Sequence, residues 1–420
     1  MIPTSPRDFL ASLFTAAVRA ADPVTGITSH LPERPKGRTV VIGAGKGAAQ
    51  MARALETVWD GQLEGVVVTR YGYGCETRDI EIIEASHPVP DAAGLVASQR
   101  LVAAIRDLTK DDLVIALICG GGSALLPAPP AGMTLEDEIA VNETLLASGA
   151  PISAMNVVRK HLSTIKGGRL AASTTARVVS LIVSDIPGDN PAHVASGPTV
   201  PDSSTRHDAI DVVRQYGLEL PQAALDHLHC KAADAPRADD PVFDTHRHHI
   251  VASAGISLEA AAELARQQGT EAVILSDSIE GEARDVALVL AAIAREVEAR
   301  DRPFKKPVVL LSGGETTVTL RVKGGKGGRN GEFALAMALA IDGHDITVLA
   351  ADTDGIDGSE DNAGAFANGE TVKRVREAGL DPRRLLDSND SYSGFAATGD
   401  LFETGPTGTN VNDFRAILIR

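Results

Sequence analysis

The chain has 420 residues, of which 44% are hydrophobic and 23% charged, a composition typical of a globular protein with two or three domains. Its formal net charge of −16 opposes binding to nucleic acid and to anionic membranes, so an anionic partner has to be small and held by local basic groups. The three cysteines show no paired spacing, which favours a reducing, cytoplasmic location. No window is long and apolar enough to predict a membrane span.

The first predicted element is an amphipathic helix rather than a signal peptide. Ser5 reads as its N-cap, Pro6 as its first helical position and Asp8 as an acid in the first turn. Apolar residues then recur at helical spacing, at Phe9, Leu10, Leu13, Phe14, Ala17 and Val18.

Short β-branched runs then alternate with Ala- and Leu-rich helical segments, which predicts an α/β fold with a mostly parallel sheet. The predicted strands are 39–44, 65–69, 80–84, 113–119, 178–183, 249–254, 271–275, 308–312 and 346–351, and the predicted helices include 46–58, 91–108, 136–148, 258–267 and 282–300. The polar segment 231–244 lacks period and apolar density, so it is the predicted linker. It separates a domain over residues 1–235 from one over residues 245–420.

Two glycine turns follow predicted strands in the first domain. Gly43, Gly45 and Lys46 form the first, and Gly120, Gly121, Gly122 and Ser123 form the second. Glycines followed by a helix start let backbone N–H groups converge on an anion, so both turns predict phosphate or carboxylate contacts. The first turn also fits a relaxed dinucleotide fingerprint, but the next strand ends in Thr69-Arg70 instead of the acid that NAD requires, although Arg70 would tolerate a 2′-phosphate.

Cations and acids gather further along the first domain. Residues 156–162 and 166–169 concentrate basic side chains, which indicates either an anion site that includes Lys166 or a solvated helix face. Asp185 and Asp189 follow an apolar strand, where carboxylates can hold Mg²⁺ or accept a proton from a hydroxyl group, or simply form a turn.

The second domain repeats these features. Glu315 follows a strand and a glycine pair, and a loop that alternates glycines with Lys323, Lys326 and Arg329 is either an anion cradle or a flexible basic hairpin tip. Asp354 lies in the Asp-rich segment 352–358, which offers hard oxygen ligands to Mg²⁺ or forms an ordinary turn. Segment 404–413, with Asn410, offers hydroxyl and amide groups to a ribose or phosphate, or is a capped loop.

Together these segments resemble the glycerate 2-kinases that carry a C-terminal MOFRL domain. The resemblance covers nearly the whole chain, through GAGKGA, GGGSALL, NVVRKHLSTIKGGRLA, SDIPGD, ASGPTVPD, GEARDVA, SGGETTVTL, GKGGRNGEFAL, DTDGIDG and TGPTGTNVND. It departs at Gly331, where the family loop usually has glutamine. The resemblance implies a Rossmann-like N-terminal domain, a smaller α/β C-terminal MOFRL domain and a cleft between them, with ATP- and Mg²⁺-dependent phosphorylation of D-glycerate to 2-phosphoglycerate.

By the same resemblance Lys46 and Arg329 are the catalytic cations, and alanine at either is predicted to slow turnover while leaving the fold intact. Asp189 is assigned to Mg²⁺ or to the hydroxyl proton, with Glu315 and Asp354 as further metal or nucleotide ligands. Two alternatives stay open: a hydroxypyruvate reductase that uses NAD(P)H, and a non-catalytic sensor of sugar acids or nucleotides. The sequence leaves the oligomeric state undecided, a homodimer included.

Overall fold

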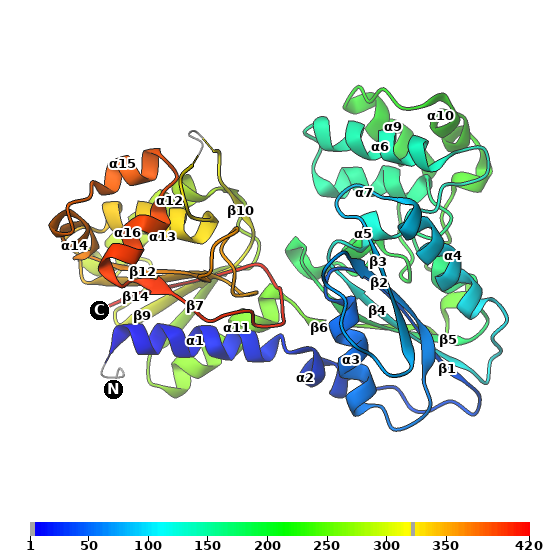
Figure 1. Ribbon diagram of the computed structural model, residues 1–420, viewed down its shortest axis with the longest axis horizontal. Helices are drawn as coiled ribbons and strands as arrows, with labels where there is room; N and C mark the ends of the chain where they lie inside the picture. The colour runs from blue at the N-terminus through cyan, green and yellow to red at the C-terminus, as the bar shows by residue number, and fades with distance from the viewer. Residues whose placement is uncertain (1–4, 321–323) are drawn as a thin grey trace. The chain divides into compact units, whose positions relative to one another are not determined.

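The computed structural model describes residues 5–320 and 324–420, and the chain divides into two compact units. The first unit is Pro23–Val251, and the second combines Met1–Asp22 with Ala252–Arg420. Each unit is built on its own six-stranded sheet with helices around it (Figure 1). The α/β fold class is therefore confirmed in both halves.

The sheet of the first unit is Rossmann-like. Its strand order is β3-β2-β1-β4-β5-β6, and every pair from β3 through β5 is parallel. The strands are β1 (Thr39–Ala44), β2 (Glu64–Arg70), β3 (Ile80–Ala85), β4 (Leu113–Cys119), β5 (Arg177–Val183) and β6 (Arg247–Ala252). β1 and β4 are buried along their whole length, which is why their sequences read as continuous apolar runs.

Helices cover this sheet and add a separate helical cluster. α4 (Ala92–Arg106) buries Ala97, Leu101 and Ile105 in the core that includes Val40 and Ile42 of β1. A second core joins α6 (Leu135–Ala147), α7 (Ile152–His161), α9 (Arg206–Gln215) and α10 (Gln222–His229). The other helices of the unit are α2 (Pro23–Thr28), α3 (Ala48–Val58), α5 (Gly122–Leu125) and α8 (Arg169–Ala172), with short 3-10 turns at Pro187–Asp189, Val194–Ser196, Lys231–Ala233 and Pro241–Phe243.

The second unit has a mixed sheet of order β13-β12-β11-β14-β9-β7, in which the β7–β9 pair is parallel and the other pairs formed by the described residues are antiparallel. Its strands are β7 (Glu271–Ser276), β9 (Val308–Ser312), β11 (Ile346–Asp352), β12 (Gly364–Asn368), β13 (Leu401–Phe402) and β14 (Asp413–Ile419), and β8 (Gly281–Glu282) pairs separately with β10 (Thr316–Thr317). Side chains of β14 alternate between two cores, because successive residues of a strand face opposite sides of the sheet.

Helices cover both faces of this sheet. α1 (Pro6–Ala20) and α11 (Ala254–Gln267) share one core, and α12 (Ala283–Arg300) and α13 (Arg329–Ala340) share the other (Figure 1). The remaining helices are α14 (Thr371–Glu377), α15 (Pro382–Asp387) and α16 (Ser391–Thr398). Within the described residues, no helix combines the length and apolar character that crossing a membrane requires.

The division between the units differs from the predicted one in two places. α1 begins where predicted, with the Ser5 side chain accepting from the Asp8 N–H, but its apolar face packs against α11 and β14 of the second unit. The predicted linker 231–244 belongs to the first unit, where Ala233 is buried and Phe243 packs on the core. The strand after that segment also joins the first sheet, as β6. Polar composition alone did not reveal these contacts.

Candidate functional site

The two glycine turns of the first unit lie side by side, because they end the neighbouring parallel strands β1 and β4. The Lys46 N–H donates to the Gly120 carbonyl at 2.8 Å, and the Gly47 N–H donates to Cys119 Sγ at 3.2 Å. Gly45 has φ +136°, and a Cβ there would overlap the backbone of Cys119. Only glycine allows this approach, so the turns predicted from sequence form one structure.

The Lys46 side chain extends over the second turn. A Cβ at Gly121 would lie 3.0 Å from Lys46 Cγ and 3.1 Å from His87 Nε2, and the φ of +79° at Gly121 also favours glycine. Lys46 is half-buried, and among the described residues its ammonium has no hydrogen-bonded or ion-paired partner. A cation without a protein counterion at a glycine turn is suited to an external anion.

Two carboxylates follow β5 at the same edge of the sheet. The Asp185 carboxylate lies directly against the Cα of Gly120, so that any side chain there would overlap it. Asp189 is partly exposed and has φ +51°, in the left-handed region that aspartate tolerates better than most residues other than glycine and asparagine. Carboxylates at this edge suit Mg²⁺, which needs only one or two protein ligands because it keeps several waters. In the part of the chain that the structure describes, no group of three or more His, Cys, Asp and Glu residues is arranged to hold a metal ion.

A chain of hydroxyl and amide groups completes this edge. Ser123 Oγ and Ser196 Oγ are 2.8 Å apart, and Ser196 donates to Asn156 Oδ1 at 3.1 Å. Ala195 and Ser196 both have positive φ values, 52° and 60°. Consecutive strained residues of this kind cost roughly 1–3 kcal/mol each and are concentrated at functional sites, so we include Ser123 and Ser196 in the candidate site.

The other predicted cations of the first unit are internal. The Lys166 ammonium is 2.9 Å from Glu138 Oε1, and the two side chains are only 1% and 6% exposed. Lys160 is likewise buried and lies 2.6 Å from Asp202, while Arg169 donates to the carbonyls of Lys160 and Ala233. The expected phosphate contact of Lys166 is therefore not supported: its charge is already neutralised inside the protein.

This burial gives a stability prediction for Lys166. Alanine at this position leaves the buried Glu138 carboxylate without its ion-pair partner, which should destabilise the first unit by about 3–5 kcal/mol. The single tryptophan, Trp59, is buried in this unit, so its fluorescence during urea unfolding reports on this unit. Leucine at Glu138 combined with methionine at Lys166 should recover much of the loss, since no charge is then left unpaired. A Lys166→Ala variant with an unchanged midpoint would contradict the structural role.

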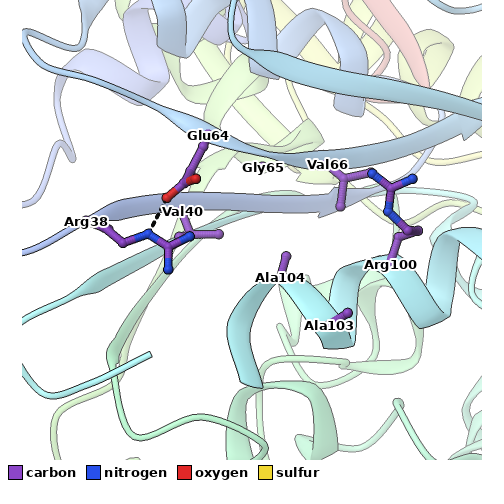
Figure 2. Close-up of a pocket in the computed structure, with 8 residues that line it drawn as sticks. All are labelled: Arg38, Val40, Glu64, Gly65, Val66, Arg100, Ala103 and Ala104. Atoms are coloured by element: carbon purple, nitrogen blue, oxygen red, sulfur yellow. Dashed lines mark hydrogen bonds and ion pairs between the residues drawn. The ribbon is translucent and has the colours of Figure 1, made fainter. Parts of the chain in front are cut away.

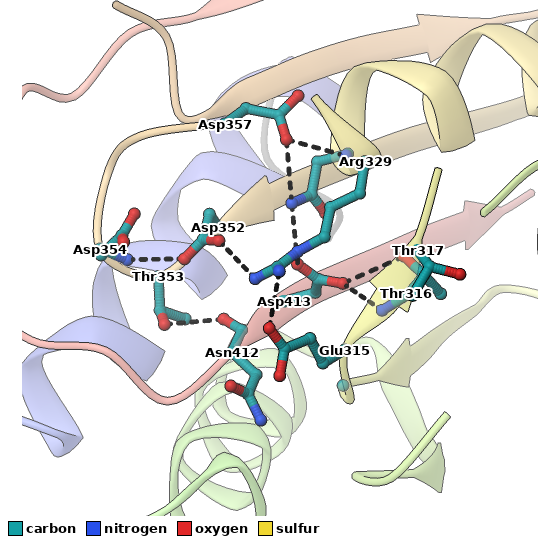
Figure 3. Close-up of polar contacts among 12 residues, drawn as sticks. Glu315, Thr316, Thr317, Arg329, Asp352, Thr353, Asp354, Asp357, Asn412 and Asp413 are labelled. Carbon is teal, nitrogen blue, oxygen red and sulfur yellow. Dashed lines mark hydrogen bonds and ion pairs between the residues drawn. The ribbon is translucent and has the colours of Figure 1, made fainter. Parts of the chain in front are cut away.

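In the second unit, Arg329 at the start of α13 is enclosed by three carboxylates (Figure 3). Its Nε donates to Asp413 at 2.6 Å, its Nη2 to Asp352 at 2.7 Å and its Nη1 to Glu315 at 2.9 Å. Burial opposes the charge of the guanidinium, but these three acids outweigh it and raise the pKa of Arg329 above its ordinary value. The predicted catalytic cation is thus firmly held and already paired.

Further acids make this cluster electronegative. Asp357 accepts from the backbone N–H groups of Asn330 and Gly331, and burial raises its pKa to about 6. Burial also raises the pKa of Asp352, in spite of the neighbouring Arg329. The fully buried Arg415 pairs with Asp413. The five carboxylates of Glu315, Asp352, Asp354, Asp357 and Asp413 outnumber the two guanidinium groups of Arg329 and Arg415, so this edge favours an added cation over a bare anion.

The glycine-rich loop before α13 packs against protein. A Cβ at Gly325 would overlap the Ser388 carbonyl, and one at Gly328 would overlap Asp357. Lys326 is exposed, and Lys323 lies outside the described residues. Gly325 and Gly328 are therefore needed for close packing within the protein. The prediction of an anion cradle had explained the glycines only by ligand binding.

Two other predicted residues of the second unit meet at the same cluster. Asn410 Nδ2 donates to Asp354 Oδ2 at 3.3 Å, and the Asp354 N–H donates to Asp352 Oδ1 at 3.1 Å. Asp354 is partly exposed, whereas the neighbouring Asp352 is buried. The structure thus gathers the predicted acids, Asn410 and Arg329 in one place.

Two open cavities lie at the opposite, amino-terminal edge of the first sheet. Their volumes are about 340 and 710 Å³, and both are lined by Arg38 and Glu64. Figure 2 shows the smaller one. The smaller one extends to Arg100, which pairs with Glu81 outside it. The arginines here already have exposed acidic partners, and ligands of open α/β sheets bind at the carboxyl ends of the strands, so we place the candidate site at the glycine turns.

Known proteins resemble this chain over nearly its full length. A family model described as a domain of unknown function, DUF4147, matches residues 9–229, and the MOFRL family model matches residues 308–413. A glycerate 2-kinase of Pyrococcus horikoshii is 40% identical over 98% of this chain and 97% of its own length. A putative hydroxypyruvate reductase of Agrobacterium vitis is 51% identical over 99% of this chain and 95% of its own length. The crystal structure of a glycerate kinase from Thermotoga maritima superimposes with a TM-score of 0.90 at 38% identity, covering 100% of both chains.

The fold and these similarities define the class as α/β phosphotransferases that act on an alcohol group. Within that class, the chain belongs to the glycerate 2-kinase family with a MOFRL domain.

Proposed function

We propose that this protein catalyses transfer of the γ-phosphoryl group of ATP to the 2-hydroxyl group of D-glycerate, with Mg²⁺ as the metal. The observation that carries the proposal is the Lys46 ammonium, which lies over two interlocked glycine turns without a protein counterion among the described residues. Phosphoryl transfer needs alignment and charge neutralisation more than covalent chemistry, and a cation of this kind supplies both.

Each of these residues of the first unit has its own proposed role in the reaction. Lys46 neutralises the charge on the transferring group, and backbone N–H groups of Gly120 to Gly122 orient phosphate or carboxylate oxygens. Asp189, partly exposed at the same edge, offers a hard oxygen to Mg²⁺, which when bound neutralises phosphate charge. Ser123, held by Ser196, orients a polar group of the substrate.

The second unit contributes a rigid charged cluster. Its excess of carboxylates suits a metal ion that accompanies a nucleotide, with Asp354 as the ligand because this residue is partly exposed. Glu315 and Asn410 are the polar contacts proposed for the nucleotide. Arg329 acts as the second cation of the reaction and, through its three carboxylates, fixes the position of the cluster.

A reductase that uses NAD(P)H is the second candidate, favoured by the name of the Agrobacterium vitis relative and by the relaxed fingerprint at Gly43. Two features oppose it. β2 ends at Arg70 rather than at the acid that would bind the ribose hydroxyls, and Arg70 stacks on Tyr73, 3.6 Å from its ring centre. A dinucleotide turn also has no need for a cation such as Lys46.

Parallel assays distinguish these activities. We expect ADP to form when the protein is incubated with D-glycerate, ATP and Mg²⁺, and no oxidation of NADH or NADPH with hydroxypyruvate. Omission of D-glycerate serves as the control for background ATP hydrolysis. Removal of Mg²⁺ with EDTA should abolish ADP formation, and added Mg²⁺ should restore it. Oxidation of the nicotinamide without ADP formation would contradict the kinase proposal and favour the reductase. Absence of both activities would favour a non-catalytic sensor.

A further inference from the structure

His87 is a titratable group at the glycine turns to which neither the sequence nor the family comparison assigns a role. It follows β3, and its Nε2 and the Lys46 side chain approach the same face of Gly121. The ring is about half-buried, and the charged groups that face it are Lys46 from the β1 turn and Arg70 from the end of β2. Burial and the two cations keep the imidazole neutral, so one of its ring nitrogens can accept a hydrogen bond.

We propose that His87 is a further catalytic residue, which accepts the proton of the substrate hydroxyl group during phosphoryl transfer. This inference rests on the proposed kinase function and adds the proton acceptor to it. The hydroxyl oxygen forms its bond to the γ-phosphorus while the bond from that phosphorus to the oxygen of the β-phosphate breaks, and the electron pair leaves with ADP. The hydroxyl proton moves to His87 Nε2 and then to solvent, so atoms and charge balance.

The surroundings of His87 suit this role better than those of the nearby acids. Burial, together with Lys46 and Arg70, lowers the pKa of His87 to about 4, so the imidazole is neutral and able to accept a proton throughout the physiological range. Kinases that use an aspartate in this role rely on a base of similar strength. A carboxylate that binds Mg²⁺ is by contrast less available to a proton, because the metal draws on the same oxygen lone pairs.

The test compares His87→Ala with His87→Gln. Glutamine keeps a polar side chain that can donate or accept a hydrogen bond, but it does not take up a proton. We expect both variants to lose kcat by about 10²-fold or more, with the KM values for ATP and D-glycerate changed much less. Wild-type kcat should stay constant through pH 6.5, where an ordinary histidine titrates, whereas kcat of both variants should rise with pH as hydroxide replaces the missing base.

Controls separate this proposal from folding and from the proposed function itself. His207, exposed on α9 of the same unit, is the matched control, and alanine there should leave kcat unchanged. An unchanged Trp59 unfolding transition in His87→Gln shows that the unit is intact. A His87→Gln enzyme within about threefold of wild type, or a loss of kcat that does not vary with pH, would overturn the role of His87. Absence of ADP formation in the wild-type protein would instead refute the kinase function.

Discussion

Alanine in place of Lys46 is expected to lower kcat by about 10³-fold without destabilising the first unit. Stability should not change because the ammonium has no ion-pair partner among the described residues, so its removal leaves no buried acid uncompensated. Initial-rate measurements of ADP formation give kcat, and Trp59 fluorescence in urea gives the stability of the unit.

Two comparisons control this prediction. Lys110 is exposed in a turn of the same unit, so Lys110→Ala removes one positive charge from the protein at a distance from the glycine turns and should keep full activity. Lys166→Ala should give the opposite pattern, with lower stability. Near-normal turnover of Lys46→Ala would contradict the role of the Lys46 ammonium, on which the proposed function depends.

Alanine in place of Arg329 is expected to abolish measurable turnover and also to destabilise the second unit by about 3–5 kcal/mol. The sequence predicted that this change would leave the fold intact, and the structure gives a reason to revise that. Asp352 and Asp413 are almost fully buried, and both lose a guanidinium partner. Hydrogen exchange of the amides at the start of α13, followed by mass spectrometry, measures the local opening, which should become much faster.

The matched control is Arg302, whose guanidinium pairs with Glu296 in the same unit but is 65% exposed. Arg302→Ala should change stability by about 1 kcal/mol or less, because exposed pairs are screened by water. Arg329→Lys keeps the charge, but its compact ammonium lacks the planar guanidinium fork that spans the three carboxylates, so this variant should also be inactive and less stable. Unchanged hydrogen exchange in Arg329→Ala would show that the cluster does not depend on this residue.

Sequence reasoning succeeded where local pattern determines structure. The strands 39–44, 113–119 and 308–312 occur with the predicted bounds, since buried parallel or central strands read as unbroken apolar runs. The glycine turns after β1 and β4 were also predicted. Their sequence shows the glycines because a Cβ at these positions would overlap neighbouring atoms. The central strand β14 was missed, since it directly follows a segment rich in glycine, threonine and asparagine that indicates only a loop.

It failed where a side chain's role depends on distant partners. Lys166 and Lys46 look alike in sequence, each beside a glycine, yet one meets Glu138 inside the core and the other meets no described acid. Asp413 and Asp352, the main partners of Arg329, are 84 and 23 residues from it. His87 precedes a proline in a loop and carries no motif. Only the fold brings its ring to Gly121.

The position of α1 has a consequence for biosynthesis. This helix precedes the whole first unit in the chain, but α11 and β14, which cover its apolar face, begin at residues 254 and 413. Phe9, Leu10 and Leu13 therefore remain exposed to solvent or to chaperones while the entire intervening unit is translated. Nascent chains stalled before the final strand should accordingly bind a hydrophobic dye or a chaperone, and deletion of residues 6–20 should remove part of that binding.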